Sequence, residues 1–269
     1  MTEPNLILSA SRRTDLPGFH ARWTAEKILR IRRPIHSVFF WTKHPAAFVE
    51  PGPLRNLVEN ELANPLLLVT ITGLGGTRLE PNVPPWRDAA GALKDALRVF
   101  RTQPERLRWR FDPVLPGVDA PALFASIAPR LRDLGLDHCI VSLPAAVSLK
   151  GNLIGQYESS SVGTWTEPEA RAAFEAILEA ASRLSLRIVS CATRALVEWF
   201  PGRIEPSTCV DAALASRMHP GRIPLEHVKD PAQRRHCGCS VSEDIGSYTE
   251  TLCRSGCLYC YSKAGGPPG

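Results

Sequence analysis

Three cysteines near the C-terminus carry the clearest chemical signal in this sequence of 269 residues. Cys253, Cys257 and Cys260 follow C-x3-C-x2-C spacing, with an aromatic residue just before the last. Gly256 permits the sharp bend that would turn their thiolates toward one side of a short loop. Thiolates at such spacing select an iron–sulfur cluster or zinc over harder ions. A cubane cluster needs four ligands, so this loop would leave one iron open to the amino and carboxylate groups of S-adenosylmethionine (SAM).

A second group of cysteines leaves several interpretations open. Cys237 and Cys239 are separated by one glycine. They could supply a fourth ligand to the first cluster, which would close it against SAM. They could instead form a second metal centre, zinc or iron–sulfur, together with Cys191 and Cys209. Cys191 is equally well explained as a buried apolar thiol, and Cys139, inside an apolar run, is expected in the core.

Composition and the N-terminus restrict the location and partners of the protein. Neither a basic leader nor an apolar run long enough for a signal peptide or a membrane span is present near Met1. We therefore expect a cytoplasmic protein without a membrane partner, whose cysteines are reduced and available to metals. The net charge is +5. The densest basic patch is either a solvated helix face or a nucleic-acid footprint, and it comprises Arg22, Lys27, Arg30, Arg32 and Arg33.

Apolar, β-branched runs alternate with amphipathic stretches along the chain. Strands are expected at Leu6–Ser9, His36–Thr42, Leu66–Thr72, Leu107–Phe111, Cys139–Leu143 and Leu186–Cys191. Helices are expected at Arg22–Ile31, Leu54–Leu62, Ala89–Phe100, Leu123–Leu134 and Thr166–Leu184. This alternation predicts an α/β fold with a parallel sheet, either a TIM-like (β/α) barrel, partial or full, or an open doubly wound sheet. Residues 1–233 would form the barrel domain, 234–262 a cysteine-rich segment completing it, and 263–269 a disordered tail.

Polar residues follow four of the expected strands. In parallel α/β folds the carboxyl ends of the strands carry the chemistry. The mixture of cations and anions at these ends predicts a polar ligand over the mouth of the sheet. SAM fits, because its carboxylate needs a cation, its ribose an acceptor and its ammonium a carboxylate or hydroxyl. The candidate binding residues are Arg13, Thr14, Asp15, Lys43, Thr72, Glu80, Arg110 and Asp112.

Several sequence blocks together resemble a known family, from about Ile7 to Ser262. The blocks are SASRRTDLP, FWTKHP, ITGLGG with LEPNVP, RWRFDPV, CGCSVSEDIGSY and CRSGCLYCYS. They resemble the family of domain of unknown function 1848, which by itself implies no activity. The cysteine motif also looks like that of the radical SAM enzymes. Thr14-Asp15, Thr42-Lys43 and Glu80-Pro81 occur in the order found in spore photoproduct lyase and its relatives.

Those enzymes carry the cysteine loop on their first strand, whereas here it lies at the end of the chain. The resemblance therefore implies a circular permutation, tolerable because domain termini often lie close together. We expect the segment Asp244–Tyr248 to shape the strand that leads to the cysteine loop. Residues around Tyr248–Leu252 would then lie parallel to and beside Leu6–Ser9.

The radical SAM resemblance implies a role for each site residue. Cys253, Cys257 and Cys260 would hold a [4Fe–4S] cluster, and Lys43 would pair with the SAM carboxylate. The candidates for the amino group are Thr14 and Asp15, and those for the ribose are Thr72 and Glu80.

The implied activity is reductive cleavage of SAM followed by hydrogen abstraction from a substrate that the sequence does not identify. Such an enzyme needs an electron donor such as ferredoxin or flavodoxin. An alternative is a non-catalytic zinc or iron–sulfur protein that binds nucleic acid through its basic face. A barrel hydrolase with a mononuclear metal is a third reading.

Overall fold

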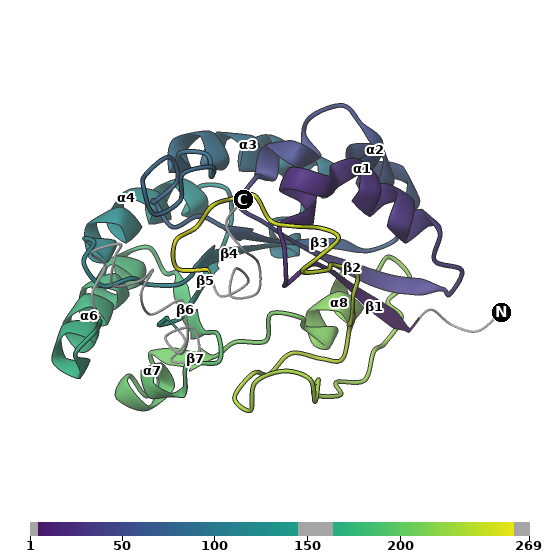
Figure 1. The fold of residues 1–269 in the computed structure, drawn as a ribbon. Coiled ribbons are helices and arrows are strands. Elements are labelled where there is room, and N and C mark those ends of the chain that lie inside the picture. The colour runs from purple at the N-terminus through teal and green to yellow at the C-terminus, as the bar shows by residue number, and fades with distance from the viewer. Residues whose placement is uncertain (1–4, 145–163, 261–269) are drawn as a thin grey trace.

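The computed structural model describes residues 5–144 and 164–260 (Figure 1). One sheet of eight strands runs through the molecule in the order β7-β6-β5-β4-β3-β2-β1-β8, and every pairing in it is parallel. The strands are β1 (Leu6–Ala10), β2 (Ile35–Thr42), β3 (Pro65–Thr70), β4 (Leu107–Phe111), β5 (His138–Val141), β6 (Arg187–Ser190), β7 (Ile204–Pro206) and β8 (Glu243–Asp244). Within the described residues β7 does not pair with β8, so the sheet is open, as in a partial barrel. The predicted parallel α/β fold is confirmed, while the expected tail 263–269 lies outside the described residues.

Helices alternate with the strands. They are α1 (Leu16–Leu29), α2 (Pro53–Asn56), α3 (Trp86–Val99), α4 (Ala120–Arg132), α6 (Glu167–Arg183), α7 (Arg194–Trp199) and α8 (Ala212–Met218). Short turns of other helix types are η1 (Pro45–Phe48), η2 (Leu57–Glu61) and η3 (Pro104–Arg106). The expected capping box is present, because Thr166 and Glu169 exchange side-chain-to-backbone hydrogen bonds at the start of α6. None of the helices described has the length and apolarity needed to cross a membrane.

Helix α1 starts six residues earlier than the sequence pattern predicts. Asp15 caps it by accepting a hydrogen bond from the Gly18 N–H, at 3.0 Å. Pro17 occupies the first turn, where its missing N–H has no cost. The polar segment after β1 therefore has a structural task, since it starts the helix that follows.

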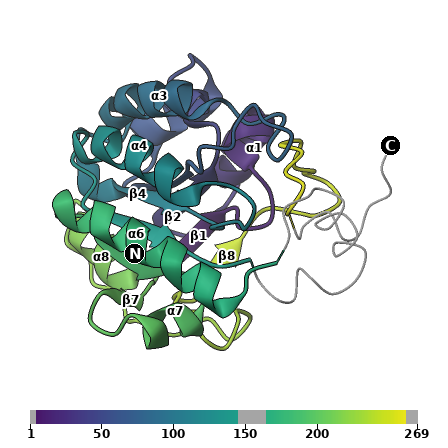
Figure 2. The same cartoon turned by 90° about the vertical axis from the view of Figure 1, so that its left-hand side faces the viewer.

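The two faces of the sheet bury different sets of side chains, because successive residues of a strand point to opposite sides. Leu8, Phe40 and Leu67 join the main core beneath α1, α3 and α4. Phe39 and Leu66 face the other way and pack with a smaller apolar cluster that includes residues of α8. Figures 1 and 2 show α1, α3 and α4 on one side of the sheet and α8 on the other. We call the side of α8 the inner face.

The C-terminal segment adds the edge strand β8 beside β1. Leu8 pairs with Glu243 and Ser9 with Asp244, in parallel. The prediction that Tyr248–Leu252 would form this strand is wrong, since the pairing lies several residues earlier. Ser247–Thr251 instead makes a turn in which the Ser247 N–H donates to Thr251 Oγ1, at 2.9 Å. Such side-chain-to-backbone bonds compete with strand pairing.

The carboxylate of Asp244 attaches this segment to the end of β1. Its Oδ2 accepts hydrogen bonds from Ser9 Oγ at 3.0 Å and from the Arg12 N–H at 2.9 Å. Its Oδ1 accepts from the Gly246 N–H at 3.0 Å and from the Ser11 hydroxyl. The side chain is only 6% exposed, so these bonds are shielded from water. Asp244 thus fixes the position of the segment that leads to the cysteine loop.

Replacing Asp244 with alanine should lower the free energy of unfolding by about 3 kcal/mol, because several buried donors lose their acceptor together. Urea denaturation measures this change. Glu243→Ala is the matched control, because Glu243 lies in the same strand with its side chain 47% exposed and pairs with the exposed Arg33. Losing that surface pair should cost less than about 1 kcal/mol. Equal costs for the two variants would contradict the role given to Asp244.

Candidate metal and cofactor site

A cavity lies where the carboxyl ends of the strands meet the cysteine loop, Cys253–Cys260. Its volume is about 160 Å³. All three cysteines of the loop line it, beside residues that follow β1 and β2 and residues within β2, β3 and β4. The remaining lining residues are Ser11, Arg12, Arg13, Thr14, Asp15, Trp41, Thr42, Lys43, Thr70, Arg110 and Ser255. The cysteine loop therefore lies over the same end of the sheet as the polar strand ends, as the sequence predicts.

This cavity is smaller than the ~300–1,000 Å³ that is usual for a ligand pocket. A nucleoside-sized ligand would extend beyond it, or the cysteine loop would have to move outward. Larger hollows of about 500 Å³ beside Trp199 and about 280 Å³ beside His36 lie elsewhere. Neither of them is lined by cysteine. This cavity is the candidate site because of the cysteines and charged residues that line it, and not because of its volume.

Residues 79–82 hold the cysteine loop in place. The Leu258 N–H donates to the Leu79 carbonyl at 3.0 Å, and the Asn82 N–H donates to the Ser255 carbonyl at 3.2 Å. Gly256 has a φ of +74°, and a Cβ added to it would lie 2.8 Å from Pro81 Cγ. Glycine is needed both for this left-handed backbone and for the close approach. The loop is thus fixed by a segment far away in the sequence.

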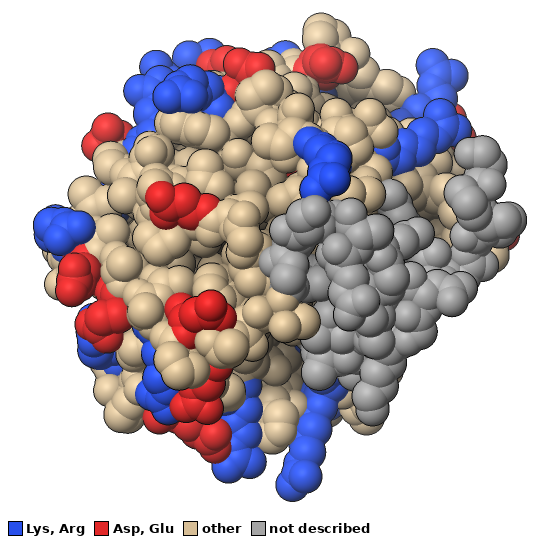
Figure 3. All heavy atoms as spheres, turned by 60° about the vertical axis from the view of Figure 1, so that its left-hand side comes forward, with Lys and Arg blue, Asp and Glu red and all other residues tan. Residues whose placement is uncertain are grey.

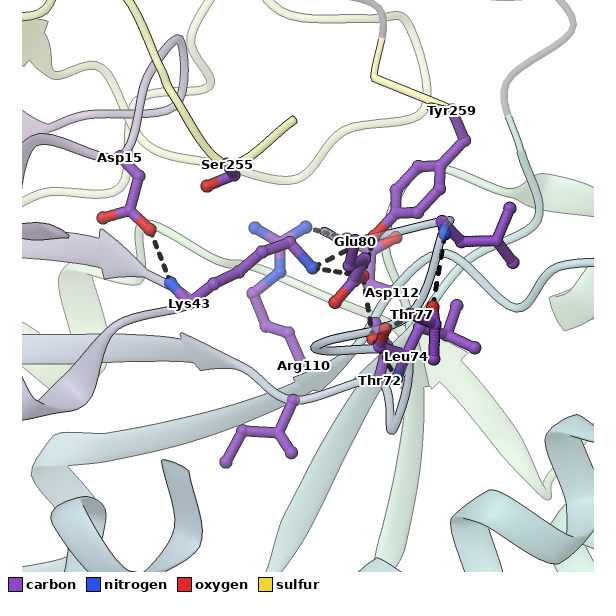
Figure 4. A network of polar contacts seen from close by, with 12 residues as sticks. Asp15, Lys43, Thr72, Leu74, Thr77, Glu80, Arg110, Asp112, Ser255 and Tyr259 are labelled. Atoms are coloured by element: carbon purple, nitrogen blue, oxygen red, sulfur yellow. Dashed lines mark hydrogen bonds and ion pairs between the residues drawn. The ribbon is translucent and has the colours of Figure 1, made fainter. Parts of the chain in front are cut away.

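Glu80 is the centre of a buried hydrogen-bond network beside the cavity (Figure 4). Its Oε1 accepts from Lys43 Nζ and from Thr72 Oγ1, both at 2.8 Å, and from the Tyr259 hydroxyl. Lys43 Nζ also donates to Tyr259 Oη at 3.0 Å. Glu80 is 1% exposed. Because Tyr259 belongs to the cysteine loop, this network joins the loop to the lysine expected to bind a ligand carboxylate.

Burial and charge set the protonation of the groups around the loop. Burial acts to lower the pKa of Lys43, but Glu80 and Cys257 outweigh it, and the pKa is raised overall. Burial raises the pKa of the Cys257 thiol to about 12, although the Lys43 ammonium opposes this. Burial, with the nearby Glu80 carboxylate, also raises the pKa of Tyr259. Cys257 is thus a neutral thiol without a metal, and a coordinated metal ion would deprotonate it.

The other charged residues predicted for the site have partners within the protein. Asp15 accepts hydrogen bonds from Thr42 Oγ1 and the Lys43 N–H, both at 2.7 Å, besides capping α1. Arg110 pairs with Asp112 and stacks over the Trp41 ring, 4.8 Å from its centroid. These contacts fix the side chains before any ligand arrives.

Three polar atoms in residues that line the cavity are buried without a hydrogen-bond partner among the described residues. They are Thr14 Oγ1, Trp41 Nε1 and Arg110 Nε. Each such group costs about 1–3 kcal/mol when it is left unsatisfied. A polar ligand in the cavity would supply the missing partners. These unpartnered hydrogen-bonding groups fit a ligand rich in oxygen and nitrogen.

The structure divides the predicted binding residues into two layers. Arg13, Thr14, Asp15, Lys43 and Arg110 line the cavity. Thr72, Glu80 and Asp112 do not line it. Glu80 binds the lining residue Lys43, Asp112 binds the lining residue Arg110, and Thr72 donates to Glu80.

The sequence analysis missed the parts played by Trp41, Thr42 and Tyr259. Trp41 and Thr42 directly precede Lys43 at a polar strand end. Tyr259 lies between two of the metal-ligand candidates. Their positions beside predicted site residues could have pointed to them. Their contacts could not be inferred, because the partners lie far away in the sequence.

The second group of cysteines also comes together, on the inner face of the sheet. Cys191, Cys209, Cys237 and Cys239 belong to one buried cluster there, whereas Cys139 lies in the main core as expected. None of the four lines the cavity, and Cys237 and Cys239 are grouped with Cys191 and Cys209 rather than with the cysteine loop. In the described part of the chain, no three His, Cys, Asp or Glu side chains are already arranged to hold a metal ion. Metal binding at either group therefore requires the thiols to move together.

Comparison with known protein families shows to which family the chain belongs. Residues 27–262 match the family described as "Domain of unknown function (DUF1848)". The chain belongs to the DUF1848 family. The match includes Lys43, Glu80 and the three cysteines of the loop, while β1 and Asp15 precede it. A search of curated proteins found no match.

Replacing Gly256 with alanine should destabilise the protein and reduce the iron retained after anaerobic reconstitution. The added methyl group would meet both an unfavourable φ and the Pro81 ring. Gly202→Ala separates these causes, since Gly202 has the same φ of +74° but nothing within 4 Å of an added Cβ. It should cost about 1–2 kcal/mol and leave iron retention unchanged. If the two variants behave alike, contact with Pro81 does not position the loop.

Proposed function

We propose that this DUF1848 protein is a radical SAM-type enzyme. Cys253, Cys257 and Cys260 would hold a [4Fe–4S] cluster. The cluster, when bound and reduced, supplies the electron for reductive cleavage of SAM, which leads to hydrogen abstraction from a substrate still to be identified. One observation carries the proposal: the cysteines of one loop line the same cavity as Lys43 and the residues that carry the unpartnered polar atoms.

The residues of the loop fit a thiolate-bound cluster. Cys253 and Cys260 are partly exposed, while Cys257 is 4% exposed. The Cys257 thiol interacts electrostatically with both other thiols, so the three share one neighbourhood. Three soft ligands at this spacing would leave one iron without a protein ligand. That is the arrangement a chelating amino acid group needs.

Residues around the cavity would bind and orient SAM. Lys43 Nζ has two hydrogen-bond partners among the described residues, Glu80 and Tyr259, and an ammonium group has three hydrogens. The third is available to the SAM carboxylate. The Thr14 hydroxyl suits the amino group, and the Trp41 and Arg110 N–H groups suit ribose oxygens.

Glu80 would act as a positioning residue. Because it binds Lys43, Thr72 and Tyr259 through one buried oxygen, it fixes the ammonium relative to the cysteine loop. The resemblance suggested that Glu80 or Thr72 approaches the ribose. The hydrogen bonds favour an indirect role for both.

The place of β8 supports the circular permutation that the resemblance implies. An added strand beside β1, parallel to it, occupies the position that a strand preceding β1 would take. The cysteine loop then follows this strand at the carboxyl end of the sheet. The proposal further requires a one-electron donor such as ferredoxin or flavodoxin, and a reducing compartment such as the cytoplasm.

The nucleic-acid alternative has no specific contact in its favour. The residues of the basic patch are exposed, but Arg30 pairs with Glu26 at 3.7 Å and Arg33 pairs with Glu243. On the face shown in Figure 3, cationic and anionic side chains are interspersed. Such a mixture is typical of a solvated surface rather than a phosphate-binding one.

Cys257→Ala should abolish both the cluster absorbance at about 400 nm and the formation of 5′-deoxyadenosine from SAM. Anaerobic reconstitution with iron and sulfide, then SAM and a reductant, measures both. Cys139→Ala is the control, since Cys139 is also buried but lies in β5 within the main core. An intact cluster in the Cys257 variant would refute the ligand assignment. A parent protein that retains zinc and does not turn over SAM would favour the non-catalytic alternative.

Lys43→Met should weaken SAM binding to the reconstituted protein by about 10–100-fold, or about 1.5–3 kcal/mol, because a charge-assisted hydrogen bond is lost. Anaerobic equilibrium dialysis with labelled SAM measures the affinity. Lys94→Met, at an exposed position of α3, should leave it unchanged. Equal affinities of the Lys43 variant and the parent would rule out the carboxylate contact.

A further inference from the structure

We propose that Cys191, Cys209, Cys237 and Cys239 bind a single zinc ion in a structural site separate from the cysteine loop. The proposal does not depend on the radical SAM function. It rests on the burial of four thiols from three distant parts of the chain in one cluster, and on the contact between two of them.

The four cysteines come from three segments that meet on the inner face. Cys191 directly follows β6, and Cys209 lies three residues after β7. Cys237 and Cys239 belong to the segment that leads to β8. All four are at most 9% exposed. Buried thiols from separate segments seldom gather without a common partner, because together they would repel one another on ionising.

Two of the four sulfur atoms are in direct contact, and the other two lie nearby. Cys191 Sγ and Cys209 Sγ are 3.8 Å apart. Cys239 Sγ accepts the Val210 N–H at 3.4 Å and lies near enough to the thiols of Cys209 and Cys237 for each of them to influence its pKa. All four thiols thus lie in one buried cluster, with Cys191 and Cys209 in direct contact.

The one short sulfur–sulfur distance favours a single ion over a cluster. Zinc–sulfur bonds of about 2.3 Å in a tetrahedron place neighbouring sulfurs about 3.8 Å apart. The Cys191–Cys209 separation has this value. The thiolates around a cubane cluster lie farther apart, because several irons separate them. A closed, tetrahedral set of four thiolates is typical of structural zinc.

Nearby arginines would balance the charge of such a site. Four thiolates and one Zn²⁺ carry a net charge of about −2. Arg110 and Arg234 interact electrostatically with Cys191, and Arg12 interacts with Cys239. These cations reduce the cost of burying an anionic centre. The surrounding apolar side chains of the inner face exclude water from it.

A zinc ion here would hold a segment that has little regular structure of its own. Residues 219–242 contain no helix or named strand. They are joined to the rest by a few backbone bonds, such as that from the Ser240 N–H to the Val210 carbonyl, at 2.9 Å. Zinc would cross-link this segment to the ends of β6 and β7. It would thereby fix the start of β8 and the position of Asp244.

Zinc binding requires the sulfurs to move closer together, because no three of these side chains are already arranged around one point in the described part of the chain. Movements that bring all four sulfurs toward one point would complete the tetrahedron. The ion would displace the thiol protons and replace the sulfur–sulfur hydrogen bonds with stronger metal–sulfur bonds.

Metal analysis of the Cys253→Ala/Cys257→Ala/Cys260→Ala protein tests the proposal, since the first site is absent from it. This triple variant should retain about one zinc ion per chain after purification in zinc-containing buffer. Adding Cys209→Ala should remove the zinc, while adding Cys139→Ala should not. Zinc X-ray absorption of the triple variant should show four sulfur ligands at about 2.3 Å.

A chemical measurement avoids the risk that Cys209→Ala fails to fold. A mercurial reagent titrated into the triple variant should release its zinc as about four thiols react. A triple variant free of zinc would overturn the proposal, as would zinc retained with Cys209→Ala in place. Iron with iron–iron scattering would show a cluster instead of a single ion. None of these outcomes depends on SAM cleavage, so this proposal and the enzymatic one fail separately.

Discussion

The carboxylate of Asp244 is the interaction on which the arrangement of this protein depends. It joins the end of β1 to a segment more than two hundred residues later, through Ser9, Ser11 and the Arg12 backbone. Because the chain reaches the cysteine loop only after this point, its attachment decides where the loop can lie. A carboxylate suits the task, since it accepts several hydrogen bonds at once and each is strengthened by burial.

A second shared acceptor couples the loop to the rest of the site. Glu80 Oε1 receives hydrogen bonds from Lys43, Thr72 and Tyr259, which come from two strand ends and the cysteine loop. A movement of the cysteine loop would therefore shift the position of Lys43, and a movement of Lys43 would shift the loop. Asp15 works similarly between α1 and the end of β2. The cavity is thus lined by residues that buried carboxylates have already positioned.

Much of the fold could be predicted because its signals are local. All six expected strands are present, with their ends shifted by at most two residues. The errors have local causes as well. Asp15 was read as a site residue and is also the cap of α1, so the helix started earlier than its apolar pattern showed. The strand β8 has only two residues, which is too short for a periodic pattern, and the polar turn Ser247–Thr251 follows it.

The sequence by itself determined the residues of the cysteine loop, the alternation of strands and helices, and the polar strand ends, because each depends on spacing between near neighbours. Only the tertiary structure decided which of those polar groups face the cavity and which support them. It also decided that Cys191 and Cys209 meet Cys237 and Cys239. These contacts form between residues that are far apart in the sequence and that sheet order and loop packing bring together. A periodic pattern along the chain therefore does not indicate them.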